Sequence, residues 1–235
     1  MHDMAEAIAL ALGLVARGDA DLFEIVLLSL RVSLTATAVA CVLGLTLGAF
    51  LAVARFPGRG AALVALNALM GLPPVVVGLL VYLHLSRSGP LGFLGLLYTP
   101  TAMIVAQTVL ITPIVAALSR QVIEDLHREY ADQFRSLGLT RWQSMGALLW
   151  DGRFSLLTVA MAGFGRAVAE VGAVMIVGGN IDHLTRVMTT AIALETSKGD
   201  LPLALALGLV LMVIALGVNA GVQALRLPGE RVAHA

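Results

Sequence analysis

Five long apolar stretches alternate with polar segments along the chain. The apolar stretches fall at residues 22–54, 61–86, 98–119, 154–178 and 201–225. Because a helix needs about 20 apolar residues to cross the hydrocarbon layer of a membrane, each stretch is long enough to span it. The pattern therefore predicts an all-α, polytopic membrane protein with about five transmembrane helices, in a transmembrane domain at residues 22–226.

Prolines interrupt two of these stretches. Pro73 and Pro74 follow Gly71-Leu72 in the second stretch and together remove two backbone donors, so we expect the helix to kink or break there. Thr112-Pro113 predicts a similar interruption in the third stretch. Inside a membrane, a break survives only where protein or water covers the freed backbone groups.

The two chain ends are predicted to lie outside the spans. Residues 1–21 contain a short apolar run led by Asp3 and Glu6 instead of the basic residues of a signal peptide, which predicts an N-terminal interfacial helix. Residues 227–235 are predicted to form a C-terminal tail.

A polar segment at residues 120–153 contains about a third of the charged residues of the chain. It is too polar to span a membrane. Its first half predicts an amphipathic helix that ends at Gly138. The apolar positions of this helix recur at helical spacing: Leu126, Tyr130, Phe134 and Leu137.

A second helix is predicted after that glycine. Thr140 and Gln143 have the spacing of a capping box, and Trp142, Met145 and Leu149 would share one face. Two interpretations of the resulting helix-turn-helix remain open. It is either a stiff connector between two spans, or a docking element whose apolar side chains enter a cleft on a partner.

Composition supports the assignment to the membrane. Hydrophobic residues make up 59% of the chain, charged residues 13%, and the mean hydropathy is +0.93. The formal net charge is zero, so nothing indicates a nucleic-acid partner. Cys41 is the single cysteine and excludes a disulfide within the chain.

The distribution of basic residues predicts the orientation. With five spans the chain ends lie on opposite sides, and a cytoplasmic polar segment puts nine basic residues inside and five outside, as the positive-inside rule requires. The inside set is Arg55, Arg59, Arg120, Arg128, Arg135, Arg141, Arg153, Arg226 and Arg231. The N-terminus is then outside and the C-terminus inside.

The sequence indicates no chemistry of its own. The only lysine, Lys198, lies between Ser197 and Gly199 and cannot belong to a phosphate-binding loop. The histidines show no metal-ligand spacing, and there are no paired catalytic carboxylates. We therefore expect a non-enzymatic chain without a metal site or a bound cofactor.

The run Asp132-Gln133-Phe134-Arg135-Ser136-Leu137-Gly138 resembles the "EAA" loop of permease subunits of ATP-binding cassette importers. In that family the loop forms coupling helices that sit in a groove of a cytoplasmic ATPase, which uses ATP and Mg. The resemblance implies a type I importer fold. It also assigns ATPase coupling to Asp132, Gln133, Phe134, Ser136, Leu137, Gly138, Leu139 and Thr140. This copy departs from the motif at Asp132, Gln133, Phe134 and Trp150-Asp151.

Further motifs resemble the molybdate and tungstate branch of these permeases. They are Leu72-Pro73-Pro74-Val75-Val76-Val77-Gly78, residues 164–173 and residues 175–200, and the combination is most similar to tungstate permeases. The resemblance implies a prokaryotic inner-membrane importer that works with an extracytoplasmic binding protein, a second permease copy and surrounding lipid. Molybdate and sulfate are the alternative substrates. An ion-coupled secondary transporter is the alternative mechanism, because broken helices often mark its substrate sites.

Several residues are candidates for the pore. Arg166 and Glu170 stand four apart in the fourth span, so they form either a structural pair or a pore element in which Arg166 attracts the oxyanion. The apolar run that includes Met175 and Val177 could gate by dewetting, with Gly178 and Gly179 as flexible points. Hydroxyl and amide donors to an oxyanion are predicted at Thr189, Thr190 and Asn180.

Small residues follow one face of the first span. Ser29, Ser33, Thr37 and Cys41 recur at four-residue steps, and Gly44 and Gly48 form a GxxxG motif. The motif indicates close helix packing, either within one subunit or between two copies.

Overall fold

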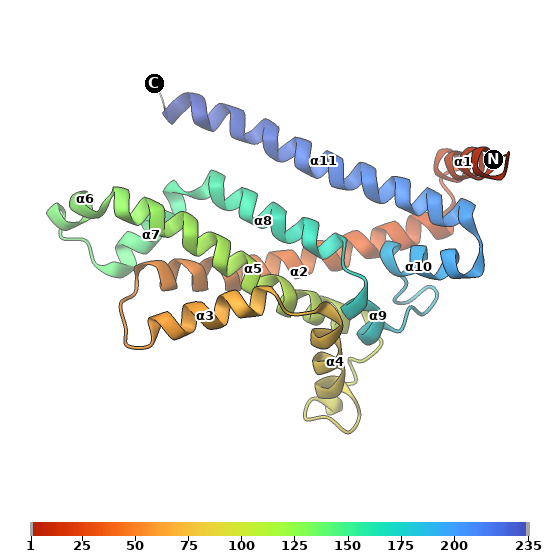
Figure 1. Ribbon diagram of the computed structural model, residues 1–235, viewed down its shortest axis with the longest axis horizontal. Coiled ribbons are helices and arrows are strands. Elements are labelled where there is room, and N and C mark those ends of the chain that lie inside the picture. Colours follow the sequence, from red (N-terminus) through yellow and green to blue (C-terminus); the bar gives the residue numbers. More distant parts are fainter. Residues whose placement is uncertain (1, 234–235) are drawn as a thin grey trace. The chain divides into compact units, whose positions relative to one another are not determined.

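The computed structural model describes the backbone of residues 2–233 and the side chains of residues 8–221 except Ala11 and Leu14. The described elements are all helical, as predicted, and Figure 1 shows them in chain order. They are α1 (His2–Arg17), α2 (Ala20–Val53), α3 (Arg59–Met70), α4 (Pro74–Leu85), the 3₁₀ turn η1 (Gly92–Leu94), α5 (Pro100–Glu129), α6 (Ala131–Ser136), α7 (Arg141–Asp151), α8 (Arg153–Val168), α9 (Gly172–Gly178), α10 (Met188–Lys198) and α11 (Leu201–Ala233).

Three helices are long and apolar enough to cross a membrane, and the number rises to five if each of two bent helix pairs counts as one span. The three are α2, α5 and α11. The bent pairs are α3 with α4, at 100°, and α8 with α9, at 59°. The prediction of about five spans therefore agrees with the fold, but two of the predicted spans are broken.

The first break follows directly from the sequence. Gly71 ends α3, and Pro73 lies in the extended region before Pro74 begins α4. Because a proline lacks the backbone N–H and suits the first helical position, it can start α4 but cannot continue α3. The predicted break at Pro73-Pro74 is confirmed.

The helices differ from the predicted segments at three further places. Pro113 lies inside α5, which runs unbroken to Glu129. The span predicted at 154–178 is not one helix, because α8 ends at Val168 and α9 begins only at Gly172. Within the predicted C-terminal tail, residues 227–233 continue α11.

The chain divides into two compact units. The first consists of residues 1–36, 73–107 and 167–218. A cluster of buried residues joins the start of α2 to α10 and α11, and α4 packs closely on α9. At that contact, a Cβ on Gly78 would lie 2.7 Å from Cα of Ala173, so the approach of α4 to α9 requires glycine.

The second unit consists of residues 37–72, 108–166 and 219–235. Gly44 and Gly48, on α2, pack against α5 within it. A Cβ on Gly44 would lie 2.8 Å from Val115, and the hydroxyl of Ser119 donates to the carbonyl oxygen of Gly44 at 3.3 Å. Of the two interpretations of the GxxxG motif, this structure supports packing within one subunit.

Candidate functional site

A helical hairpin, α6 and α7, lies within the polar segment, in the second unit. Gly138 terminates α6 with a φ of +62° and donates its N–H to the carbonyl oxygen of Arg135 at 3.2 Å. The N–H of Leu139 reaches back to the carbonyl oxygen of Phe134 at 3.1 Å. This left-handed turn favours glycine, so the predicted helix end at Gly138 is confirmed.

The predicted capping box opens α7. The hydroxyl oxygen of Thr140 accepts the N–H of Gln143 at 3.4 Å, and Oε1 of Gln143 accepts the N–H of Thr140 at 2.9 Å. Two otherwise unpaired helix-end donors are thereby satisfied. The hairpin therefore has a defined turn geometry.

The inner face of the hairpin packs on its own unit. Leu126, Tyr130, Phe134, Met145 and Leu149 are partly buried against a core cluster that includes Ile123 and Leu148. Large apolar side chains on the inner face are thus already committed to the fold. They are not free to enter a cleft on a partner.

The outer face of the hairpin carries Leu137, which is 70% exposed. The prediction that it shares a face with Leu126, Tyr130 and Phe134 was wrong, because α6 ends at Ser136 and Leu137 lies beyond its last residue. The prediction that Trp142 shares a face with Met145 agrees with the structure, since both line one groove in which the Trp142 ring stacks on Phe50 at 6.3 Å between centroids. The exposed remainder of the predicted coupling set is Asp132, Gln133, Ser136, Gly138 and Thr140, and Leu139 is half-buried.

The break between α8 and α9, in the first unit, is stabilised by buried polar side chains. The amide nitrogen of Gln107 donates to the carbonyl oxygen of Ala167 at 3.0 Å. Oε1 of Glu170 accepts the N–H of Ala173 at 3.1 Å, and the hydroxyl of Thr189 donates to the carbonyl oxygen of Glu170 at 2.8 Å. These bonds occupy backbone groups that a continuous helix would pair internally.

This break changes the interpretation of the two ionisable residues in the predicted fourth span. Glu170 is 3% exposed and lies after the end of α8 at Val168, so the helix that carries Arg166 does not include it. Arg166 is partly buried near the end of α8 and belongs to the second unit. In this structure Glu170 serves as a cap for the start of α9.

The predicted gate residues lie on α9. Val174 and Val177 are buried, whereas Met175 is 36% exposed. A Cβ on Gly178 would lie 3.0 Å from Sδ of Met103, and Gly179 has a φ of +72°. The two glycines therefore have packing and turn roles here.

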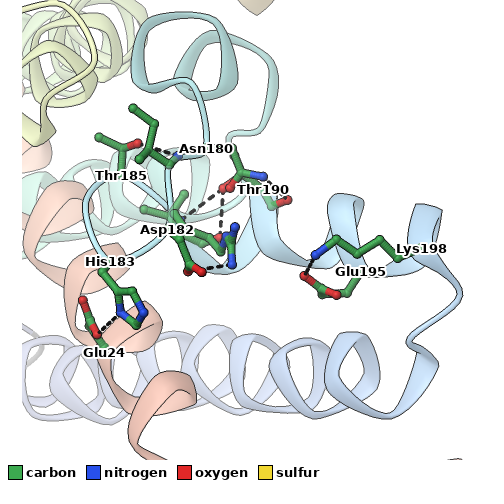
Figure 2. Close-up of polar contacts among 11 residues, drawn as sticks. Glu24, Asn180, Asp182, His183, Thr185, Thr190, Glu195 and Lys198 are labelled. Carbon is green, nitrogen blue, oxygen red and sulfur yellow. Dashed lines mark hydrogen bonds and ion pairs between the residues drawn. The ribbon is translucent and has the colours of Figure 1, made fainter.

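The loop after α9 uses its hydroxyl groups to hold its own backbone (Figure 2). Thr185 donates to the carbonyl oxygen of Gly178 at 2.6 Å and accepts the N–H of Ile181 at 2.9 Å. Thr190 donates to the carbonyl oxygen of Val187 at 3.0 Å. The amide nitrogen of Asn180 donates to the carbonyl oxygen of Thr190 at 3.4 Å. The predicted oxyanion donors of Thr189 and Thr190 are thus engaged with backbone carbonyls.

An acidic cavity of about 290 Å³ lies beside this loop in the first unit. Its acidic lining residues are Asp19, Asp21, Glu24, Asp182, Glu195 and Asp200, and its basic ones are His183 and Arg186. Ion pairs join Glu24 to His183 at 2.9 Å and Asp182 to Arg186 at 2.7 Å. The excess of carboxylates repels an anion, so this cavity is not a site for an oxyanion.

Sequence reasoning missed Gln107 and Thr185. Gln107 is 3% exposed within an apolar helix, and Thr185 is fully buried in a loop. The sequence does offer one signal for Gln107, because a side-chain amide is unusual within an apolar run. Thr185 stands in a polar loop where nothing distinguishes it from its neighbours. Among the described residues, no group of three or more His, Cys, Asp or Glu side chains is placed to hold a metal ion.

Comparisons with known proteins agree with the helical architecture. Residues 44–226 match the sequence model of a family described as "binding-protein-dependent transport system inner membrane component". The chain is 41% identical over 226 residues to a tungstate uptake system permease protein of Peptoclostridium acidaminophilum, which covers 96% of this chain and 99% of that protein.

Two further relatives extend the comparison. A tungstate uptake system permease protein of Campylobacter jejuni is 43% identical over 150 residues, which are 64% of this chain and 63% of that protein. A sulfate transport system permease protein of Escherichia coli is 32% identical over 186 residues, 74% of this chain and 66% of that protein.

Proposed function

We propose that this chain is the permease subunit of an ATP-driven importer for tungstate. The chain belongs to the family of binding-protein-dependent transport system inner membrane components. Members of this family are multi-pass membrane proteins that transport and do not catalyse a reaction. They work in general with an ATPase and a substrate-binding protein. The fold and the hairpin suit such a subunit.

The observation that carries the choice of substrate is the 41% identity to a tungstate permease across 99% of that protein's length. The sulfate permease is more distant, at 32% identity over 66% of its length. Tungstate, molybdate and sulfate are tetrahedral dianions, so the three substrates require similar permeases. Molybdate or sulfate import is the alternative function.

The hairpin is the proposed contact with the ATPase. Its inner face is packed on its own unit, so the exposed Leu137 and the turn at Gly138 are the parts that reach a groove on a partner. ATP and Mg would be bound by the ATPase and not by this chain. We therefore expect the hairpin in the cytoplasm, with the N-terminus outside and the C-terminus inside, as the positive-inside rule favours.

The proposed path for the ion lies between two copies of the chain. Up to five spans are few to enclose a hydrated dianion, so we expect a homodimer around a central pore. Arg166 and Glu170 stay candidates for the pore, together with the gate residues of α9. Arg166→Gln or Glu170→Gln should reduce uptake, and unchanged uptake with both variants would exclude them.

The substrate is tested at the partner binding protein. First, tungstate, molybdate and sulfate compete for binding to that protein. The binding protein loaded with each ion is then added to the assembled complex, and ATP hydrolysis is measured for each. We expect tungstate to bind most tightly and to stimulate ATP hydrolysis. A preference for sulfate or molybdate would replace the substrate and leave the mechanism intact.

A further inference from the structure

A second cavity, of about 490 Å³, lies behind the hairpin in the second unit. Its basic lining residues are Arg55, His127, Arg128, Arg135 and Arg141, and no acidic residue lines it. The remaining lining residues are Val53, Ala131, Phe134, Leu139 and Ser144. Because a water molecule occupies about 30 Å³ in the liquid, the cavity has room for a polyatomic anion and several waters.

The arginines converge on this cavity from four parts of the chain. Arg55 lies in the segment after α2, Arg128 in the last turn of α5, Arg135 on α6, and Arg141 at the start of α7. The positive-inside rule explains why basic residues are numerous on one side of a membrane. It does not explain why four segments direct them to the same cavity.

The arginines next to the cavity form ion pairs with carboxylates, whereas two of the arginines that line it form none. Glu124 forms ion pairs with Arg59, at 3.5 Å, with Arg120, and with Arg128, at 3.4 Å. Of these three arginines, Arg128 alone lines the cavity. Within the part of the chain that the structure describes, Arg55 and Arg141 form no ion pair.

The other basic groups of the cavity retain capacity to bind an anion. Arg128 pairs with Glu124 at 3.4 Å and with Asp125 at 3.7 Å, and Arg135 pairs with Asp132 at 3.4 Å. None of these carboxylates lines the cavity. Nδ1 of His127 is buried and has no hydrogen-bond partner among the described residues. A guanidinium group has five donors, so the single carboxylate partner of Arg135 and the two of Arg128 leave donors available on both side chains.

We propose that this cavity binds a multiply charged tetrahedral oxyanion, namely a phosphate group or an inorganic ion of the same shape. Such an ion accepts hydrogen bonds on every oxygen and pairs with the planar fork of an arginine in two-point contacts. Its charge also relieves the repulsion among the four guanidinium groups. The phosphate could come from free inorganic ions or from the head group of an anionic lipid. The site does not depend on the identity of the transported ion.

The test measures binding to the full permease in nanodiscs of neutral phosphatidylcholine. Binding of radiolabelled inorganic phosphate is measured by equilibrium dialysis. In a parallel series phosphatidylglycerol is added stepwise, and its binding is measured by native mass spectrometry. The first series detects a free ion and the second detects a lipid head group, and binding in either supports the proposal. In the series that shows binding, the variant Arg55→Gln/Arg141→Gln should lower the affinity at least about tenfold.

Two control variants make the result specific. Arg153→Gln removes an exposed arginine that contacts the rings of Trp150 and Phe154 and does not line the cavity, so it should leave binding unchanged. Arg55→Lys/Arg141→Lys keeps both charges and loses the planar guanidinium groups. Its affinity for the anion should therefore fall less than that of the glutamine variant. If the glutamine variant does not fold, the lysine variant still tests the arginine geometry, because its affinity for the anion should be lower than that of the native chain.

Three outcomes would overturn the proposal. One is the absence of binding by both probes, and another is equal binding by the native chain and the glutamine variant. The third is binding by the permease alone that disappears in the complex with the ATPase, because the cavity would then belong to the protein interface. None of these outcomes bears on ATP-driven uptake, which is measured separately.

Discussion

The side-chain amide of Gln107, on α5, donates a hydrogen bond of 3.0 Å to the carbonyl oxygen of Ala167, close to the end of α8. Ala167 is separated from Gln107 by 60 residues in sequence and is 1% exposed. In a membrane, an unpaired carbonyl at this position would have no water to bind. The bond is therefore one of the contacts that allow a span to break without loss of stability.

Gln107→Leu should destabilise the permease by about 1–3 kcal/mol, because it leaves a buried carbonyl oxygen with fewer donors. Thermal unfolding of the purified permease in detergent measures the loss. Thr46→Val is the matched control, since the Thr46 hydroxyl donates only to carbonyl oxygens of its own helix, Val42 and Leu43. Equal stability of the leucine variant and the native chain would mean that the bond to Ala167 does not stabilise the break.

Gly138→Val should weaken both the hairpin and the coupling of ATP hydrolysis to uptake. The φ of +62° at this position costs a non-glycine residue about 1–2 kcal/mol, and a β-branched side chain is especially unfavourable there. Gly138→Asn provides the control, because asparagine adopts the left-handed region more readily. Coupled uptake in reconstituted complexes should fall in the valine variant and persist in the asparagine variant. Normal coupling with valine would count against the hairpin as the coupling element.

Leu137→Asp should disrupt the association with the ATPase and leave the permease as stable as the native chain. The reason is that this side chain is 70% exposed and makes no contribution to the buried clusters described above. Leu149→Ala, on the inner face, should show the reverse pattern, with a loss of stability of about 1–3 kcal/mol. Copurification of the ATPase and thermal unfolding distinguish the two effects. A Leu137 variant that binds the ATPase normally would contradict the assignment of the outer face.

The stability contribution of His183 should depend on pH. Nδ1 of His183 lies 2.9 Å from a carboxylate oxygen of Glu24, and this hydrogen bond, together with the charges of Glu24, Asp182 and Asp21, raises the pKa of His183. The protonated form is therefore favoured in the folded state. The contribution is complete below the ordinary histidine pKa of about 6.5 and is lost as the pH rises through the higher folded-state value.

His183→Gln should remove this pH dependence. Between about pH 6 and pH 8, the melting temperature of the native permease should fall more steeply than that of the variant. The difference should be small, because the histidine side chain is 64% exposed. Parallel curves for the two proteins over this range would show that the pair with Glu24 contributes nothing to stability.

The sequence predicted features that depend on local chemistry. Hydropathy located the spans, Pro73 and Pro74 indicated the first break, and Thr140 with Gln143 indicated the start of α7. Each of these signals arises within one or a few turns of helix. The structure preserves them because no distant contact opposes them.

Features that depend on distant contacts could not be predicted in this way. The break after Val168 contains no proline, and its polar partners Gln107 and Thr189 lie far from it in sequence. The spacing of Arg166 and Glu170 therefore indicated a continuous helix where none exists. Similarly, Leu137 lies on the outer face of the hairpin because α6 ends at Ser136, although its spacing from Phe134 indicated the inner face.

ATP-driven uptake tests the proposed function most directly. The permease, its ATPase and its tungstate-loaded binding protein are reconstituted in proteoliposomes, and accumulation of tungstate is measured with ATP, without ATP, and with an imposed proton or sodium gradient. We predict accumulation that requires ATP, the ATPase and the binding protein. Accumulation driven by an ion gradient in the absence of the ATPase would contradict the proposal and identify a secondary transporter.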